Sequence, residues 1–231
     1  MQKNTLFLPL LIILMCACDK QPTILGETNV PELDGRMLYL KAYKEGDLVD
    51  IDSAQVVHGR FHFTYVADSV IMANLFIGDE SLMPVVLDGS PLTISIGDRE
   101  RKVIGSALND TLFQFIRRKT AIDEQLAEIP HRESQMIMDG LNHDDIVAQL
   151  NLEIDSLSRL EDAMLMSFIK DNMDNVLAPG VFMIITSALP YPVLTPAIEE
   201  LVTLGSESFR NNAYVQDYLR MARENMEKME Q

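Results

Sequence analysis

The stretch Val103-Ile-Gly-Ser-Ala-Leu-Asn109 separates two parts of the chain that follow different hydrophobic patterns. Before it, apolar and polar residues alternate with a period of two, and after it apolar residues recur every three or four positions. Gly105-Ser106 marks the change, because glycine punctuates strands and serine is favoured just before the first turn of a helix. The pattern predicts an α+β protein, with an N-terminal antiparallel β-sandwich or open barrel followed by an all-helical C-terminal domain.

Upstream of this boundary, the chain from Ile24 to Val103 predicts a series of short strands separated by turns. The segment His58–Val66 illustrates the pattern: a turn at Gly59 precedes aromatic residues at every second position, which places them on one face of a strand. Glycine-containing pairs, such as those at positions 34–35 and 78–79, mark turns between the other strands. No helical segment separates these strands, which favours a sandwich or an open barrel.

Downstream of the boundary, Ser106 is positioned to cap a first helix, which we expect to stop at Pro130. Apolar residues from Ile146 to Phe168 predict a second, longer helix. Further helices are expected over residues 176–188, 195–205 and 209–230.

The N-terminus combines Lys3, a ten-residue apolar run from Leu6 to Met15, and Ala17 before Cys18, as in a secretory signal peptide. The run is too short to span a bilayer, which needs about 20 apolar residues. Met15-Cys-Ala-Cys18 resembles the lipobox of bacterial lipoproteins. We therefore divide the chain into a leader (1–17), a tether with a first extended segment (18–31), a β-sandwich (32–105) and a helical domain (106–231).

The lipobox resemblance implies that Cys18 receives a diacylglycerol thioether and becomes the N-terminus. Two or three acyl chains anchor a protein stably, whereas one does not. The expected location is a bacterial cell envelope, on the periplasmic side or the cell surface, with the lipid bilayer as a partner through acylated Cys18. A plain signal peptide, or a metal site formed by Cys16 and Cys18, are the alternatives. The metal site is disfavoured because it would lie in the apolar leader without further ligands.

The net charge and the cysteine content disfavour several classes of function. The chain of 231 residues carries a net charge of −16, which disfavours a nucleic-acid partner. Its two cysteines, Cys16 and Cys18, are one residue apart in the N-terminal stretch and form no C-x-x-C pair. No catalytic triad or metal motif is recognisable in the sequence either. We expect no cofactor and a protein partner in the envelope.

Five short motifs resemble the family of the domain of unknown function 4369, over about residues 24–125. They are Asp34-Gly35, Ile51-Asp-Ser-Ala54, Gly59-Arg-Phe-His-Phe63, Val86-Leu-Asp-Gly89 and Gly105-Ser-Ala-Leu-Asn109. The resemblance implies an envelope lipoprotein of the thiol:disulfide interchange type, in which this domain precedes a thioredoxin-like domain. Because the chain to Gln231 contains no C-x-x-C motif, the implied redox activity has no residues to carry it, and we expect the thioredoxin domain to be lacking.

The histidine and aspartate residues supply only weak candidate sites. His58 and His62, if both lie in one strand, would be ~13 Å apart, too far to share a zinc ion, so they are interpreted as surface residues. Asp50 and Asp52 are expected on one sheet face, where paired carboxylates sometimes perform acid–base chemistry. Asp144 lies in an acidic stretch that lacks the ligand spacing of a calcium loop, and either Asn142 or Asp144 is expected to cap a helix.

Three functions follow, in order of preference. The first is a membrane-anchored envelope lipoprotein that acts as a non-catalytic binding or scaffold module. The second is an accessory module of a separately encoded thioredoxin-like thiol:disulfide oxidoreductase. The third is a carboxylate-based enzyme, which would need two of Asp50, Asp52, Asp144 and Glu153 together in a cleft.

Overall fold

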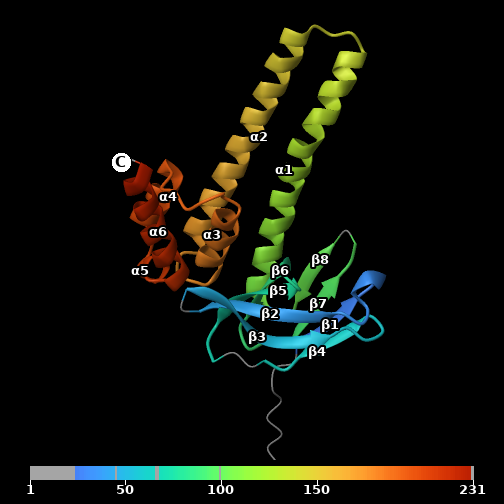
Figure 1. The fold of residues 1–231 in the computed structure, drawn as a ribbon, viewed down its shortest axis with the longest axis vertical. Coiled ribbons are helices and arrows are strands. Elements are labelled where there is room, and N and C mark those ends of the chain that lie inside the picture. The colour runs from blue at the N-terminus through green and yellow to red at the C-terminus, as the bar shows by residue number, and fades with distance from the viewer. Residues whose placement is uncertain (1–23, 45, 66–67, 99, 230–231) are drawn as a thin grey trace, which may run out of the picture.

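The computed structural model describes residues 24–44, 46–65, 68–98 and 100–229. They form a two-sheet β-sandwich from which a long helical hairpin projects, with shorter helices packed beside the base of the hairpin (Figure 1). This architecture confirms the predicted α+β class, and the β part is a sandwich and not a closed barrel. The leader, Cys18 and the first part of the tether lie outside the described residues.

Two four-stranded sheets make up the sandwich in the described part of the chain. One has the strand order β4-β1-β7-β8 and the other β3-β2-β5-β6. All neighbouring strands run antiparallel except β1 and β7, which are parallel. The strands are β1 (Ile24–Thr28), β2 (Met37–Lys44), β3 (Asp47–Gln55), β4 (Arg60–Phe63), β5 (Ile71–Ile77), β6 (Glu80–Leu87), β7 (Leu92–Ile96) and β8 (Arg101–Ile104), with a short 3₁₀ helix at Pro31–Leu33.

The core between the sheets follows from the alternation of apolar residues. In β2, Leu38 and Leu40 are fully buried, whereas Tyr39 between them faces outwards. In β4, Phe61 and Phe63 both enter the same core and pack edge to face with ring centroids 5.8 Å apart. A period of two therefore places one face of each strand in the sandwich interior.

Strands β5 and β6 depart from this alternation because both of their faces are covered. Ala73 and Leu75 of β5 enter the sandwich core. Met72 of β5 and Val86 of β6 instead pack into a second core formed with the helices. Near-continuous apolar sequence is typical of strands buried on two sides, and here it marks the sheet face on which the helical part rests.

The helical part consists of a hairpin and four shorter helices in the described residues. Helix α1 (Ala107–Met138) has 32 residues, which corresponds to a length of ~48 Å, and α2 (His143–Asp171) runs back beside it (Figure 1). A core of Ile122, Ile129, Ile146, Leu150 and Leu157 joins the two. The shorter helices are α3 (Leu177–Ser187), α4 (Pro196–Leu204), α5 (Glu207–Arg210) and α6 (Ala213–Met229).

The expectation that Pro130 stops the first helix is wrong, because α1 continues through it to Met138. Proline removes the hydrogen bond to the carbonyl four residues earlier, here that of Leu126. Pro130 lies on the exposed side of the hairpin, where water is available to that carbonyl. The packing of Ile129 against α2 then favours continuation of the helix. The true end lies at Asp139, followed by Gly140 with a φ of 77°.

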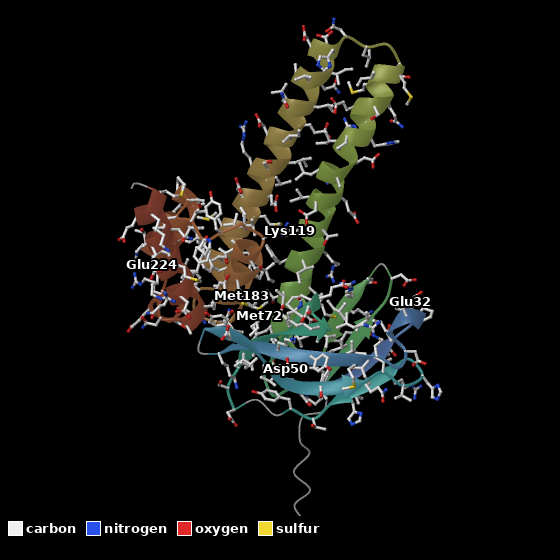
Figure 2. All side chains as sticks on the ribbon, viewed as in Figure 1. Glu32, Asp50, Met72, Lys119, Met183 and Glu224 are labelled. Carbon is white, nitrogen blue, oxygen red and sulfur yellow. The ribbon has the colours of Figure 1, made fainter. Side chains whose placement is uncertain are left out.

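Helix α3 lies against β5 at an unusually close approach. A Cβ atom added at Gly180 would lie 1.9 Å from the Sδ atom of Met72. Met183, one turn further along α3, lines a small cavity together with Met72, and Figure 2 labels both side chains between the sheet and the helices. Glycine at position 180 is therefore what allows the helix to rest on the sheet.

Candidate functional site

The junction between the sandwich and the hairpin is built around Asn109, which is fully buried in the first turn of α1. Its Oδ1 atom accepts a hydrogen bond from the Val86 N–H, and its Nδ2 atom donates one to the Val86 carbonyl. Because β6 is the last strand of its sheet, this amide occupies the place of a neighbouring strand. The hairpin therefore has a fixed attachment to the sheet edge.

Ser106 strengthens the same junction, although not in the way expected. It occupies the position before α1, but its hydroxyl makes no capping bond and donates instead to Asp88. Partial burial by itself raises the pKa of Asp88, but the hydrogen bonds from Ser106 and Ser90 outweigh that effect and hold the pKa below its usual value. Asp88 is thus a charged acceptor at the base of the hairpin.

A second contact joins the sandwich to the last helix. The Tyr43 hydroxyl on β2 donates to Asp217 on α6 at 2.7 Å, and Arg220 lies 3.2 Å from the same carboxylate. The hydrogen bond from Tyr43, followed by that from Arg220, lowers the pKa of Asp217. Burial, followed by the hydrogen bond to Asp217, raises the pKa of Tyr43. The Tyr43 ring also packs edge to face on Tyr214, with centroids 5.0 Å apart. These contacts hold α6 against the sandwich, because the Tyr43 hydroxyl and the Asp217 carboxylate bond to each other.

The tip of the hairpin carries three exposed apolar residues that lie close together along the chain. Ile137 is 54% exposed, Met138 is 77% exposed and Leu141 is 52% exposed. We call these three residues the tip patch. Exposed apolar residues gathered at one place indicate an interaction site more strongly than the same residues scattered singly.

Acidic residues border the tip patch at the end of α1 and in the first turn of α2. Asn142 caps α2 by accepting a hydrogen bond from the Asp144 N–H, so Asn142 and not Asp144 is the cap. Asp144 and Asp145 lie in the first turn of α2, and Asp139 ends α1. Negative charge in the first turn of a helix is favourable, because the helix dipole is positive there. The tip therefore combines an apolar surface with an acidic border.

Asp50 and Asp52 do not share a sheet face, and that expectation is wrong. In the register of β2 and β3, Asp50 pairs with Lys41 and Asp52 pairs with Leu40, which leaves Ile51 as a bulge residue. Paired residues point to the same side, so the bulge places the two carboxylates on opposite faces. The Asp50 carboxylate lies 3.4 Å from Lys41 Nζ.

The Asp52 carboxylate is occupied by backbone donors. Its oxygens accept hydrogen bonds from the N–H groups of Ser53, Thr64 and Tyr65. Thr64 and Tyr65 follow β4, so Asp52 joins the edge strands of the two sheets. The Asp52 carboxylate therefore helps to hold β3 of one sheet beside the end of β4 of the other.

His58 and His62 are both exposed, and they lie in different secondary-structure elements, a turn and a strand. His58 and Gly59 form the turn between β3 and β4, with φ values of 51° and 70°. His62 lies in β4 opposite Leu25. Within the described ranges, no group of three or more histidine, cysteine, aspartate or glutamate side chains is placed to hold a metal ion.

The fourth carboxylate considered for catalysis, Glu153, forms an ion pair with Arg132 across the hairpin. Asp144 and Glu153 belong to α2, whereas Asp50 and Asp52 belong to β3. The structure thus divides these carboxylates between the hairpin and the sandwich. Cys18, the expected lipidation site, lies outside the described residues.

Two features of the candidate site were not predicted from the sequence patterns. The role of Asn109 is not signalled by periodicity, because an amide in the first turn of a helix usually faces water. The tip patch has a readable signal, namely apolar residues on both sides of Asp139-Gly140. Apolar residues beside a turn at Gly140 have few neighbours to pack against. Because the first helix was expected to end at Pro130, the turn was expected there and not beside Ile137, Met138 and Leu141.

Among the described residues, no helix combines the length and the apolar composition needed to cross a bilayer. Residues 23–112 match the family model of the domain of unknown function DUF4369. The match covers the sandwich and the first turns of α1, including Asn109. Neither a curated protein nor a solved structure matches the chain.

Proposed function

Because residues 23–112 are a domain of the DUF4369 family, we propose that this domain is the base of a membrane-anchored envelope lipoprotein whose hairpin binds a protein partner. The role is non-catalytic binding or scaffolding. Acylation of Cys18 supplies the anchor, the sandwich supports the hairpin, and the tip patch supplies the contact. The family has no assigned function, so the proposal depends on the geometry of this chain.

The observation that carries the proposal is the exposure of Ile137, Met138 and Leu141 at the far end of the hairpin. Helix α1 extends ~48 Å from the sheet edge to these residues, well beyond the shorter helices (Figure 1). Interface cores are rich in such apolar anchors and poor in charge, whereas their rims are polar. The acidic border at Asp139, Asp144 and Asp145 favours a partner whose apolar pocket has a basic rim.

The fixed attachment of the hairpin supports the same role. A hairpin that moved freely would lose more entropy on binding than one held in place. Asn109 ties α1 to β6, and Arg132 pairs with Glu153 partway along the hairpin. The tip is thus presented at a defined position relative to the sandwich.

Formaldehyde crosslinking in intact cells, followed by mass spectrometry of captured proteins, tests the proposal. A variant with Ile137→Ser, Met138→Ser and Leu141→Ser is compared with Leu152→Ser, which removes an apolar side chain that is 71% exposed on the hairpin away from the tip. We expect one dominant partner with the native chain and with Leu152→Ser, and its loss from the tip variant. Equal capture by the tip variant would contradict the proposal.

Membrane fractionation tests the anchor separately. The Cys18→Ser chain is expected to leave the membrane fraction, whereas Cys16→Ser is expected to remain in it. Retention of Cys18→Ser in the membrane fraction would contradict lipid anchoring. A captured partner with a thioredoxin fold would assign the chain to an oxidoreductase as its accessory module.

A further inference from the structure

A groove of about 870 Å³ lies between α1 and α2 near the base of the hairpin. Phe115 and Phe168 meet in it with ring centroids 4.3 Å apart, and Met164 lies beside them. Ala121 and Ala163 contribute only methyl groups to its walls, which leaves space between the helices. Pockets for small molecules commonly measure about 300–1,000 Å³ and are mostly apolar with a few polar groups.

The groove is bounded by firm contacts. Above it, Ile122 packs with Leu150 and Leu157 in the hairpin core. Below it, Phe115 belongs to the core shared with the short helices. Lys119 joins the two helices directly, because its Nζ atom lies 2.8 Å from Glu161, and Figure 2 labels this side chain between α1 and α2. The helices are therefore held on both sides of the groove, and its shape is part of the fold.

One charged side chain in the groove has no acidic partner. Arg118 lines the groove and forms no ion pair with any carboxylate in the described part of the chain. Among the described lining residues, Asp171 is the only acid; it is the last residue of α2 and accepts a hydrogen bond from Ser167. The position of Arg118 in the wall of a largely apolar groove places its positive charge where it attracts an external anion.

We propose that this groove binds a single-chain anionic amphiphile, with its carboxylate or phosphate head at Arg118 and its apolar body along Phe115, Met164 and Phe168. A guanidinium recognises either head group through charge-assisted hydrogen bonds. From Thr111 to Ile122 the groove follows α1 for eleven steps, or ~16 Å, which suits an alkyl chain of medium length. The adaptable side chain of Met164 suits a flexible ligand.

Photolabelling of the full chain in non-ionic detergent tests the proposal. The probes are diazirine analogues of dodecanoate and of dodecyl phosphate, with a diazirine analogue of dodecanol as the uncharged control. Mass spectrometry is expected to place the label between residues 111 and 122 or between 160 and 172. Preference for one of the two anionic probes identifies the head group. Labelling elsewhere, or equal labelling by the dodecanol probe, would overturn the proposal.

Variants at neighbouring positions provide matched controls. Arg118→Gln is expected to reduce labelling by the anionic probes about tenfold, and Arg118→Lys to retain most of it. Arg117→Gln removes the adjacent charge, which does not line the groove, and should change nothing. Unchanged labelling of Arg118→Gln would overturn the role of this charge.

A second pair of variants tests the cavity itself. Ala163→Leu fills the groove and is expected to abolish labelling, whereas Ala148→Leu places the same side chain on an exposed part of α2 outside it. Far-ultraviolet circular dichroism shows whether each variant keeps its helices. If Ala163→Leu is folded and still labelled at the groove, the proposal fails. Because none of these substitutions alters the tip patch, the result is independent of partner capture there.

Discussion

Asn109 of α1 pairs with Val86 of β6 through both hydrogen-bonding groups of its side-chain amide. The Val86 N–H donates to Oδ1 at 2.9 Å, and Nδ2 donates to the Val86 carbonyl at 2.8 Å. Both residues are fully buried, so water does not reach these groups. One side chain thus satisfies the edge of a sheet and fixes the start of a 32-residue helix.

Asn109→Ala is predicted to lower the free energy of unfolding by about 2–4 kcal/mol, because two buried backbone groups of Val86 lose their partners. Urea denaturation of the purified protein measures the change. Asn151→Ala, at an exposed position of α2, is the matched control and should change stability little. A cost for Asn109→Ala as small as that of the control would show that the hairpin does not depend on this pairing.

Gly180→Ala is predicted to destabilise the protein by about 1–3 kcal/mol through overpacking against Met72. Met72→Ala makes room for the new methyl group, so the double variant should be more stable than the sum of the two single changes predicts. Thermal unfolding of all four proteins gives this coupling energy. Additive effects would show that the methionine and the glycine do not constrain one another.

Pro130→Ala is predicted to raise the free energy of unfolding by about 1–3 kcal/mol, because alanine restores the hydrogen bond to the Leu126 carbonyl inside a continuous helix. Urea denaturation again measures the difference. A fall in stability would instead indicate that the proline ring contributes more by packing, or by restricting the unfolded chain, than its missing N–H costs.

The charge on Asp88 gives a pH dependence of definite sign. Its pKa in the folded protein lies below the usual value of 3.8, so its contribution to stability is present above about pH 4 and is lost as the pH falls through the lowered pKa. Ser106→Ala removes a hydrogen bond that lowers this pKa. The variant should therefore be less stable than the native protein near pH 7, and the difference should shrink toward pH 2. A difference that grows in acid would contradict this account.

The sequence predicted the α+β class because local patterns carry that information. Alternating residues such as Phe61 and Phe63 identify a strand without knowledge of its neighbours, and Gly105-Ser106 marks the change of period. Pro130 misled because its effect depends on which side of the helix meets water. Asp50 and Asp52 misled because a bulge at Ile51 depends on the partner strand. These properties arise from pairing and packing, which no local pattern records.

The tip patch, too, could not be predicted from local sequence patterns. Ile137 and Met138 fit a helical pattern, and such residues usually face a core. They are exposed because the hairpin extends beyond the short helices, and only the assembled fold reveals that length. Arg118 is similar, since its value as a ligand group depends on its position in the groove and on its forming no ion pair with a carboxylate of the described residues.

The most direct measurement is site-specific photocrosslinking in intact cells with a photoreactive amino acid at position 138 or at position 128. Both positions are exposed on α1, but only Met138 belongs to the tip patch. The account predicts a single protein adduct from position 138, none from position 128, and loss of the adduct when Leu141→Asp is added. Absence of an adduct from position 138, or the same adduct from both positions, would contradict it.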